Sequence, residues 1–200
     1  MLKVYGDTQS GNCYKVKLLL SFLGVEYKWQ HVNILDGETE TEEFLALNPN
    51  GKIPVVILDD GRALCESNAI LGYFAENTGF LPSDSYARAK VYEWLFFEQY
   101  SHEPYIAVAR FIQKYLGLPE ERRAEYESRQ SGGNKALSVM ERQLSQTPFL
   151  AGESLSIADI SLYAYTHVAH EGGFDLNNYP NIKAWCIRIE STPGYTAIGN

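Results

Sequence analysis

The chain has 200 residues, enough for one large domain or two small ones, and 45% of them are hydrophobic, which is sufficient for a core. Its formal net charge of -8 and the lack of a basic block argue against nucleic acid or an anionic membrane as a partner. No apolar run approaches the length of a membrane span.

The first third of the chain predicts alternating strands and helices. Residues 2–5 and 26–34 are typical of strands, whereas 12–24 has apolar residues at helical spacing and ends at Gly24. A short helix follows over 41–48, then two strands within 53–65 joined by an Asp60-Gly61 turn, then a helix over 67–79. This order predicts a mixed sheet flanked by helices.

The composition changes near residue 80, where Pro82 and polar residues interrupt the pattern. Beyond this break the chain is predicted to be helical, at roughly 86–116, 119–146, 156–170 and 180–192. We therefore expect an α/β domain over 1–79, a linker over 80–86 and an all-α domain over 87–200.

The cysteines at positions 13, 65 and 186 are far apart and form no CxxC or Cys/His cluster. The sequence therefore predicts neither a metal site nor a dithiol redox pair. The N-terminus begins with a strand-like segment and has no signal-peptide pattern, so we expect a reduced, cytoplasmic setting.

The segment NPNGKIPVV (48–56) places Pro54 directly before a strongly β-prone run. Proline cannot donate to a strand ladder, so this arrangement fits either a cis Pro54 that opens the strand or an edge-strand trans turn. In the cis case the backbone of Ile53 is left unpaired, and an extended peptide-like ligand can pair with it.

The segment CESNAI (65–70) places Glu66 and Ser67 where a strand ends and a helix begins. Ser67 is a candidate N-cap, and the helix N-terminus can bind a carboxylate while Glu66 accepts from an ammonium. Simple capping is the alternative. By contrast, the Ser156-x-x-Asp159 pattern predicts a structural capping box.

The segment GDTQSGNCYKVKLL (6–19) offers Thr8, Ser10 and Cys13 as reactive side chains. Helical spacing places Cys13 on the apolar side, where burial raises a thiol pKa. Thr8 lies at the strand end, while Ser10 lies just ahead of the helix, either as a plain N-cap or as a hydroxyl directed at a ligand.

Together these segments resemble the cytosolic glutathione S-transferase family, over nearly the whole chain. The resemblance rests on NPNGKIPVV, ESNAI and SIADI in register, and on YPNIKAWCIRIESTPGY (179–195), which is similar to the family's last long helix. It implies a thioredoxin-like N-terminal domain that binds glutathione and a helical domain that supplies most of the second-substrate pocket. It also implies a homodimer, a detoxification role and no metal.

The resemblance implies a role for each glutathione-site residue. Glu66 and Ser67 would hold the γ-glutamyl end, Pro54 would be cis, and Ile53 would pair with the cysteinyl unit. Lys52 would lie near the glycyl carboxylate or the peptide backbone. One segment departs from the family: where serine-type members often carry His and Lys, this chain has the acidic GETETEEF (37–44), so either Lys52 holds the glycyl carboxylate or the grip on glycine is weak.

The family differs in its first loop, where some classes use a strand-end Tyr and others use Ser, Thr or Cys. Here Ser10 has the position typical of serine-type bacterial theta-, phi- or nu-like members, with Asn12 as the second candidate. Tyr5 stands at the strand end, as a wall of the glutathione site or a remnant.

The second-substrate pocket is expected to be lined from residues 93–111, with Tyr105 and Arg110 as contacts. His102 is expected on the helix surface. The resemblance also implies an acidic residue that reaches the partner subunit's glutathione site, for which Glu98 and Glu103 are both candidates.

Three functions follow from the resemblance. The first is conjugation of glutathione to small hydrophobic electrophiles, with glutathione as co-substrate. The second is glutathione-dependent reduction of disulfides, or a peroxidase reaction. The third is a non-catalytic glutathione-binding or interaction module that uses this fold for assembly, against which the intact Ser10, Pro54 and Glu66-Ser67 set argues.

Overall fold

The computed structural model describes residues 1–199, which form two compact units. Unit 1 comprises Met1–Glu76 together with the tail that begins at Pro193, and unit 2 comprises Asn77–Thr192. The sequence pattern places this tail in the helical domain, whereas in the structure it belongs to unit 1. Tyr14 Oη donates to the carbonyl of Thr196 at 2.7 Å, and Ser21 Oγ donates to that of Gly194 at 2.7 Å.

Unit 1 contains a mixed sheet with the strand order β2–β1–β3–β4. Strand β1 pairs in parallel with β2 and antiparallel with β3, which pairs antiparallel with β4. The strands are β1 (Lys3–Gly6), β2 (Lys28–His31), β3 (Val55–Ile57) and β4 (Ala63–Cys65). The predicted mixed sheet is confirmed, and Gly61 has the positive φ of 87° that its turn requires.

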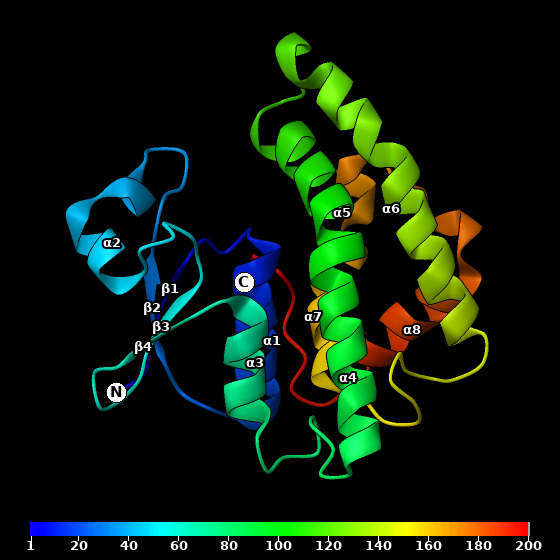
Figure 1. Cartoon of the computed structure of the whole chain (residues 1–200), viewed down its shortest axis with the longest axis horizontal. Coiled ribbons are helices and arrows are strands. Elements are labelled where there is room, and N and C mark those ends of the chain that lie inside the picture. Colours follow the sequence, from blue (N-terminus) through cyan, green and yellow to red (C-terminus); the bar gives the residue numbers. More distant parts are fainter. Residues whose placement is uncertain (200) are drawn as a thin grey trace. The chain divides into compact units, whose positions relative to one another are not determined.

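Helices cover both faces of this sheet, with α1 and α3 on one side and α2 on the other (Figure 1). The helices of unit 1 are α1 (Gly11–Leu23), the 3-10 turn η1 (Glu38–Glu40), α2 (Glu42–Leu47) and α3 (Ser67–Ala75). Gly24 ends α1 in the left-handed conformation, as predicted.

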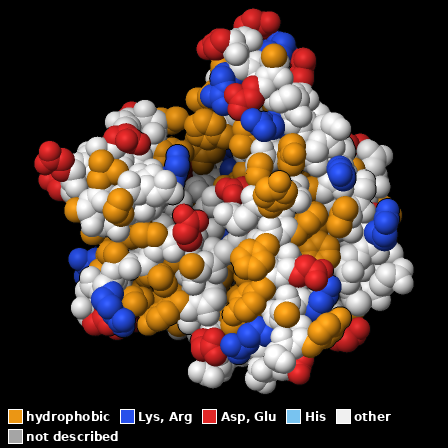
Figure 2. Space-filling model, in the orientation of Figure 1, with side chains coloured by type: hydrophobic (Ala, Val, Ile, Leu, Met, Phe, Trp, Pro, Cys, Tyr) orange, Lys and Arg blue, Asp and Glu red, His pale blue; other side chains and the backbone are white. Residues whose placement is uncertain are grey.

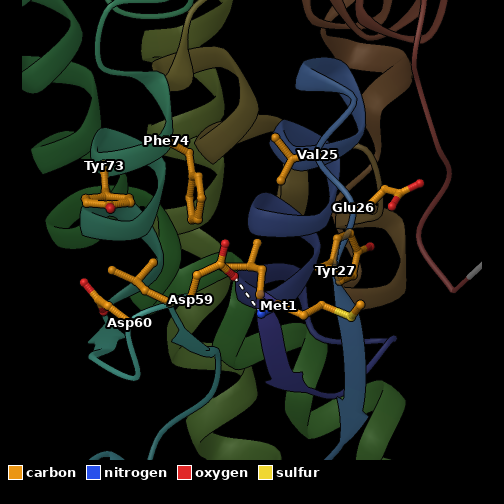
Figure 3. Close-up of a pocket in the computed structure, with 10 residues that line it drawn as sticks. Met1, Val25, Glu26, Tyr27, Asp59, Asp60, Tyr73 and Phe74 are labelled. Atoms are coloured by element: carbon orange, nitrogen blue, oxygen red, sulfur yellow. Dashed lines mark ion pairs between the residues drawn. The ribbon is translucent and has the colours of Figure 1, made fainter.

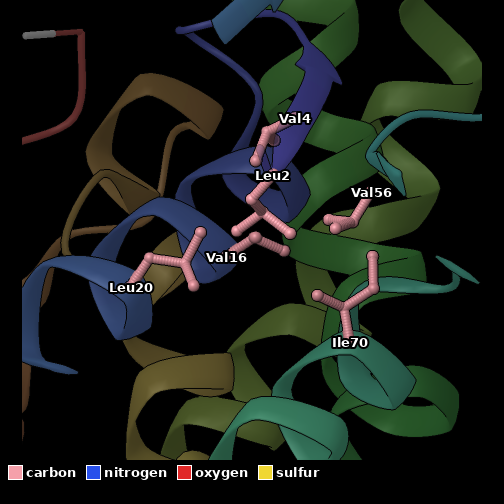
Figure 4. Close-up of a cluster of buried hydrophobic side chains, with 6 residues drawn as sticks. All are labelled: Leu2, Val4, Val16, Leu20, Val56 and Ile70. Carbon is pink, nitrogen blue, oxygen red and sulfur yellow. The ribbon is translucent and has the colours of Figure 1, made fainter. Parts of the chain in front are cut away.

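The main core of unit 1 fills the space between the sheet and the α1/α3 pair (Figure 4). Val4 and Val56 come from β1 and β3, Val16 and Leu20 from α1, and Ile70 from α3. Because side chains alternate along a strand, Tyr5 points to the other face, into a second cluster beside α2. This alternation decides which side chains reach each face of the sheet.

Unit 2 is helical, as predicted, and its residues 77–192 are all described. Its elements are α4 (Ser85–Phe97), η2 (Glu98–His102), α5 (Glu103–Arg110), η3 (Phe111–Tyr115), η4 (Glu120–Arg122), α6 (Arg123–Leu144), α7 (Ile157–Thr166), η5 (Ala169–Gly172), η6 (Leu176–Asn178) and α8 (Pro180–Glu190).

The helix expected over 86–116 is interrupted by two π-helical turns, η2 and η3. Pro104 follows η2, and proline has no N–H to donate into a helix. The wider turn is closed by the Glu103 amide, which donates to the carbonyl of Glu98 five residues earlier. This insertion changes which side chains face inward, and it buries His102, which we had expected on the surface.

The capping box at Ser156 and Asp159 is confirmed. The buried Asp159 carboxylate accepts from the amides of Leu150 and Ser156 and from Trp185 Nε1, at 2.8–3.0 Å. Burial raises its pKa, although these donors act in the opposite direction. Asp159 therefore joins three segments of unit 2 and has a structural role.

Candidate functional site

Ser10 caps the N-terminus of α1. Its backbone is extended (φ −71°, ψ 125°), and its Oγ accepts from the amide of Cys13 at 3.4 Å. The loop before it is fixed by Asp7, whose carbonyl accepts from the Ser10 amide and whose carboxylate accepts from the Gln9 amide. Ser10 is half-buried, so a ligand can reach its hydroxyl at the positive end of the helix dipole.

Cys13 is fully buried one turn after Ser10, as predicted. It packs against Gly6 so closely that a Cβ added at Gly6 would lie 2.6 Å from its Sγ. Burial raises the pKa of the Cys13 thiol to about 12, against smaller lowering effects of hydrogen bonds from Ser10 and Asp7. A thiolate at this position is therefore disfavoured near neutral pH.

Asn12 and Ser67 bring the N-termini of α1 and α3 together. Ser67 Oγ lies 3.2 Å from Asn12 Oδ1, and the Nζ of Lys15 lies 3.4 Å from the same hydroxyl. Ser67 and Lys15 are buried, whereas Asn12 is half-buried. Two helix N-termini side by side, with a cation beneath them, favour a negatively charged group at this edge of unit 1.

Sequence reasoning missed Lys15, because a lysine is usually exposed and the helical pattern was assigned from leucines and valines. Its spacing of three residues from Asn12 is the signal that places both on one face of α1.

Glu66, and not Ser67, occupies the N-cap position of α3. Its φ of 64° is in the left-handed region, and its side chain makes no capping hydrogen bond. The prediction of Ser67 as N-cap is therefore wrong by one residue, because the chain turns sharply at Glu66 before the helix begins. Glu66 is exposed and available to a ligand.

The peptide bond between Ile53 and Pro54 is cis. Ile53 lies outside β3, and in the part of the chain that the structure describes no hydrogen bond joins its backbone to another group. The preceding loop is held by the buried Asn48, whose Nδ2 donates to the carbonyl of Lys52 at 2.7 Å. Lys52 itself is exposed.

Tyr5 lies on the α2 side of the sheet, where it packs with Val32, Phe44 and Val55. It lines a cavity of about 520 Å³ whose polar lining includes two acidic residues, Glu38 and Glu43. The lining residues are Tyr5, Gln30, His31, Val32, Glu38, Thr41, Glu43, Phe44 and Leu47. Tyr5 thus takes part in a different environment from Ser10 and Asn12, which belong to α1.

A larger cavity of about 910 Å³ lies elsewhere in unit 1 and contains none of the predicted site residues (Figure 3). Tyr73 and Phe74 from α3 line this cavity together with Met1, whose amine pairs with Asp59 at 3.0 Å. Size alone therefore does not identify the chemical site in this unit.

In unit 2, the two predicted second-substrate residues differ in their surroundings. Tyr105 is half-buried and lines a cavity of about 210 Å³, where a Cβ added at Gly132 would lie 2.2 Å from its ring. Arg110 is 2% exposed, and its Nε donates to Glu171 Oε2 at 2.6 Å. Lys114 pairs with the same carboxylate.

The buried titratable groups of η2 have partners within unit 2. His102 Nε2 lies 2.9 Å from Thr166 Oγ1, and Thr166 donates to the carbonyl of Leu162. Gln99 Nε2 donates to both Glu98 and Glu103, the two candidates for a residue that crosses to a partner subunit. Glu98 is fully buried and Glu103 is half-buried.

Within residues 1–199, no group of three or more His, Cys, Asp or Glu side chains could hold a metal ion. None of the helices described is both long and apolar enough to cross a membrane.

Protein-family models match both units. The glutathione S-transferase N-terminal domain matches residues 9–77, and the glutathione S-transferase C-terminal domain matches residues 92–193. The chain belongs to the glutathione S-transferase family. The expected architecture, a thioredoxin-like domain followed by a helical one, is confirmed with it.

The relatives that this chain resembles in sequence include a named disulfide-bond oxidoreductase and a named glutathione S-transferase. The disulfide-bond oxidoreductase YfcG of Escherichia coli is 32% identical over 189 residues, which cover 91% of this chain and 87% of that protein. Glutathione S-transferase 3 of Zea mays is 31% identical over 206 residues, covering 97% and 91%.

Among solved structures, a glutathione S-transferase from Pseudomonas fluorescens has a TM-score of 0.98 and 63% identity, covering 100% of this chain and 99% of that one. The transferase therefore shares its fold closely with bacterial members of the family.

Proposed function

We propose that this enzyme binds glutathione in unit 1 and activates it as a thiolate for attack on small hydrophobic electrophiles. The observation that carries the proposal is the placement of Ser10 at the N-cap of α1. Its Oγ accepts from the Cys13 amide, so its single hydroxyl proton is left to donate to a ligand sulfur.

The energy required for this activation is modest. A free thiol has a pKa of about 8.5, and lowering it by about 2 units takes about 2.7 kcal/mol. A hydrogen bond to an ionised group contributes about 1.5–3 kcal/mol. A helix N-terminus adds about 0.3–1 kcal/mol. The two effects together are sufficient.

The reaction balances without a protein nucleophile. The thiol proton leaves to solvent, and the sulfur lone pair forms a bond to the electrophilic carbon. The leaving group departs with the electron pair of its broken bond. Ser10 donates a hydrogen bond throughout and keeps its proton.

We assign the remaining parts of glutathione to the other predicted site residues of unit 1. Glu66 and Ser67 hold the γ-glutamyl end, where an exposed carboxylate can accept from the ammonium and the α3 N-terminus attracts the carboxylate. The backbone of Ile53, beside Pro54, pairs with the cysteinyl unit. Exposed Lys52 is the cation for the glycyl carboxylate. Tyr5 is a more distant wall, reached through the cavity beside α2.

For the second substrate we propose Tyr105 of unit 2 as a contact and Arg110 as a support of the pocket. Tyr105 offers an aromatic face beside a small cavity. Arg110 does not line that cavity and is held in a buried ion pair with Glu171, so its expected role is to fix the surrounding helices and not to touch substrate. The electrophile is expected to be small and hydrophobic, because this part of unit 2 is lined largely by aromatic and apolar side chains.

Reduction of disulfides is the second candidate function, and the similarity to YfcG, a named disulfide-bond oxidoreductase, favours it. One disulfide and two glutathiones would give two thiols and glutathione disulfide, so no protein thiol takes part. In a peroxidase reaction, two glutathiones would reduce a hydroperoxide to an alcohol and water.

A paired assay separates these functions. Purified enzyme is given glutathione with chlorodinitrobenzene, with 2-hydroxyethyl disulfide or with cumene hydroperoxide. Turnover of the aromatic chloride supports conjugation, and turnover of the disulfide or the peroxide alone overturns it. Calorimetry with glutathione tests the non-catalytic alternative, and absence of binding excludes both enzyme functions.

We also propose a cytoplasmic homodimer. Hydrophobic side chains gather on the surface over α4 (Figure 2), where Tyr92, Phe96 and the following Tyr100 are exposed. Phe96 is 71% exposed, and water contact with so large an aromatic group favours burial against a second copy. The Phe96→Glu variant should elute as a monomer in size-exclusion chromatography, whereas an unchanged elution volume would contradict this interface.

A further inference from the structure

Lys15 is a fully buried lysine on the face of α1 that packs against α3. Lysine is among the residues least often buried, because its ammonium loses hydration there. Its Nζ lies 3.4 Å from Ser67 Oγ, at the first residue of α3. The Lys15 ammonium is thus placed at the residue that begins α3.

The direction of the hydrogen bonds follows from the inventory of protons. An ammonium has donors only, whereas a serine hydroxyl has one proton and two lone pairs. Lys15 therefore donates to Ser67, and Ser67 must direct its own proton away from Lys15. In the structure that proton points to Asn12 Oδ1 at 3.2 Å.

We propose that Lys15 is a positioning residue that keeps Ser67 as a hydrogen-bond donor to the γ-glutamyl carboxylate of glutathione. This inference rests on the proposed function of Glu66 and Ser67. Because one lone pair of the Ser67 hydroxyl accepts from Lys15, the hydroxyl proton is directed away from Lys15 and can be donated to an anion. The buried cation adds attraction for the same carboxylate, in surroundings where charges are weakly screened.

Binding of the carboxylate also changes Asn12. Ser67 has a single proton, so when the carboxylate takes this hydrogen bond, Asn12 Oδ1 gives it up. Asn12 stands two residues from Ser10, at the end of the helix where the sulfur is expected. Occupation of the γ-glutamyl subsite would therefore change one hydrogen bond of a residue next to the sulfur subsite.

The test compares two ligands that differ in one group. Glutathione and γ-aminobutyryl-cysteinylglycine are identical except that the second lacks the α-carboxylate of the γ-glutamyl unit. Titration calorimetry gives the dissociation constants for the full-length wild-type enzyme and for Lys15→Met, Lys15→Arg and Lys17→Met. Lys17 is the matched control, because it removes the same charge from a half-buried position of the same helix.

We expect the wild type to prefer glutathione by at least about tenfold, the effect of about 1.4 kcal/mol. Lys15→Met should reduce this preference to about twofold or less, Lys15→Arg should restore part of it, and Lys17→Met should leave it unchanged. In a Ser67→Ala background, Lys15→Met should change the preference no further. In steady-state assays, Lys15→Met should raise KM more than it lowers kcat.

Equal weakening of both ligands by Lys15→Met, or an unchanged preference, overturns the inference and leaves the proposed function intact. A wild type that binds neither ligand overturns the proposed function, and this inference with it. Thermal melting without ligand checks that each variant is folded, and Ser67→Ala provides the same comparison should Lys15→Met fail to fold.

Discussion

Ser10 Oγ and the backbone amide of Cys13 are joined by a hydrogen bond of 3.4 Å, so one short turn presents a hydroxyl outward and turns a thiol inward. The cap sets the orientation of both side chains, because Ser10 stays outside the helix that begins at Gly11, whereas Cys13 lies within it and is buried in the core. The neutral hydroxyl, and not the more reactive thiol, is left at the surface of the site.

The first prediction concerns Ser10. Replacement by Ala removes the hydrogen bond to the thiolate, worth about 1.5–3 kcal/mol, so kcat/KM for conjugation should fall about 10- to 150-fold. Glutathione affinity should change little, and stability should fall by about 1 kcal/mol with the lost cap. Ultraviolet absorbance of the bound thiolate should titrate at higher pH. Full activity in Ser10→Ala, with loss in Asn12→Ala or Tyr5→Phe, would reassign the role.

The second prediction orders the cysteines by reactivity. Burial raises the thiol pKa of both Cys13 and Cys186 to about 12, whereas Cys65 is only half-buried and its thiol pKa is raised by burial and by Glu66. At pH 8, iodoacetamide should therefore label Cys65 first and Cys13 only after unfolding, as followed by peptide mass spectrometry. Cys13→Ala should retain conjugation activity. Rapid native labelling of Cys13 would contradict its burial.

The third prediction concerns the contact between Gly132 and Tyr105. A methyl group at Gly132 would overlap the Tyr105 ring, so Gly132→Ala should lower the unfolding free energy by about 1–3 kcal/mol. Urea denaturation measures the change. Gly72→Ala is the matched control, since its Cβ meets nothing within 4 Å and alanine is the better helix former.

A second substitution tests the cause of that loss. Tyr105→Val should recover part of the stability in the Gly132→Ala background, because it removes the ring that the methyl group meets. No recovery would place the strain elsewhere in α6.

The fourth prediction concerns pH and His167. This imidazole stacks on Tyr163 with ring centroids 4.4 Å apart, and burial lowers its pKa to about 4. The unfolded chain binds this proton near pH 6.5, so the folded state loses stability as the pH falls from 6.5 toward 4, by up to about 1.4 kcal/mol per pH unit.

The contribution of His167 is isolated by comparing slopes. The His167→Phe variant keeps an aromatic ring and has no proton to bind, so its stability should fall less steeply between pH 6.5 and pH 4. Urea denaturation of both proteins at several pH values gives the two slopes. Parallel slopes would show that His167 is not the responsible group.

The order of elements in unit 1 could be predicted because the strands are short β-prone runs separated by turn residues and α1 has apolar residues at helical spacing. Val16 and Leu20 lie in the core as expected, and the Asp60-Gly61 turn is present. The exact residue at which a helix begins could not be predicted. The cap of α3 is Glu66 and not Ser67, and the positive φ of Glu66 that causes this shift has no signature in the sequence.

The site could be predicted only where motifs marked it. The cis bond at Pro54 is confirmed, and the family resemblance identified Ser10 and Ser67 as candidates whose roles stay predictions. Lys15 and His102 could not be predicted, because burial of a charged or polar group depends on partners far along the chain, such as Ser67 and Thr166. The π-helical turn at Glu98–His102 likewise has Pro104 as its only local sign.

The return of the tail to α1 has a consequence for biosynthesis. Unit 1 is built from two separate segments of the sequence. Tyr14 and Ser21 of α1 donate hydrogen bonds to the carbonyls of Thr196 and Gly194, which belong to the second segment. A ribosome that has released residues 1–76 has made the sheet and its helices, but not the segment that covers α1. The first unit to emerge is thus the last to be completed, after all of unit 2 has been synthesised.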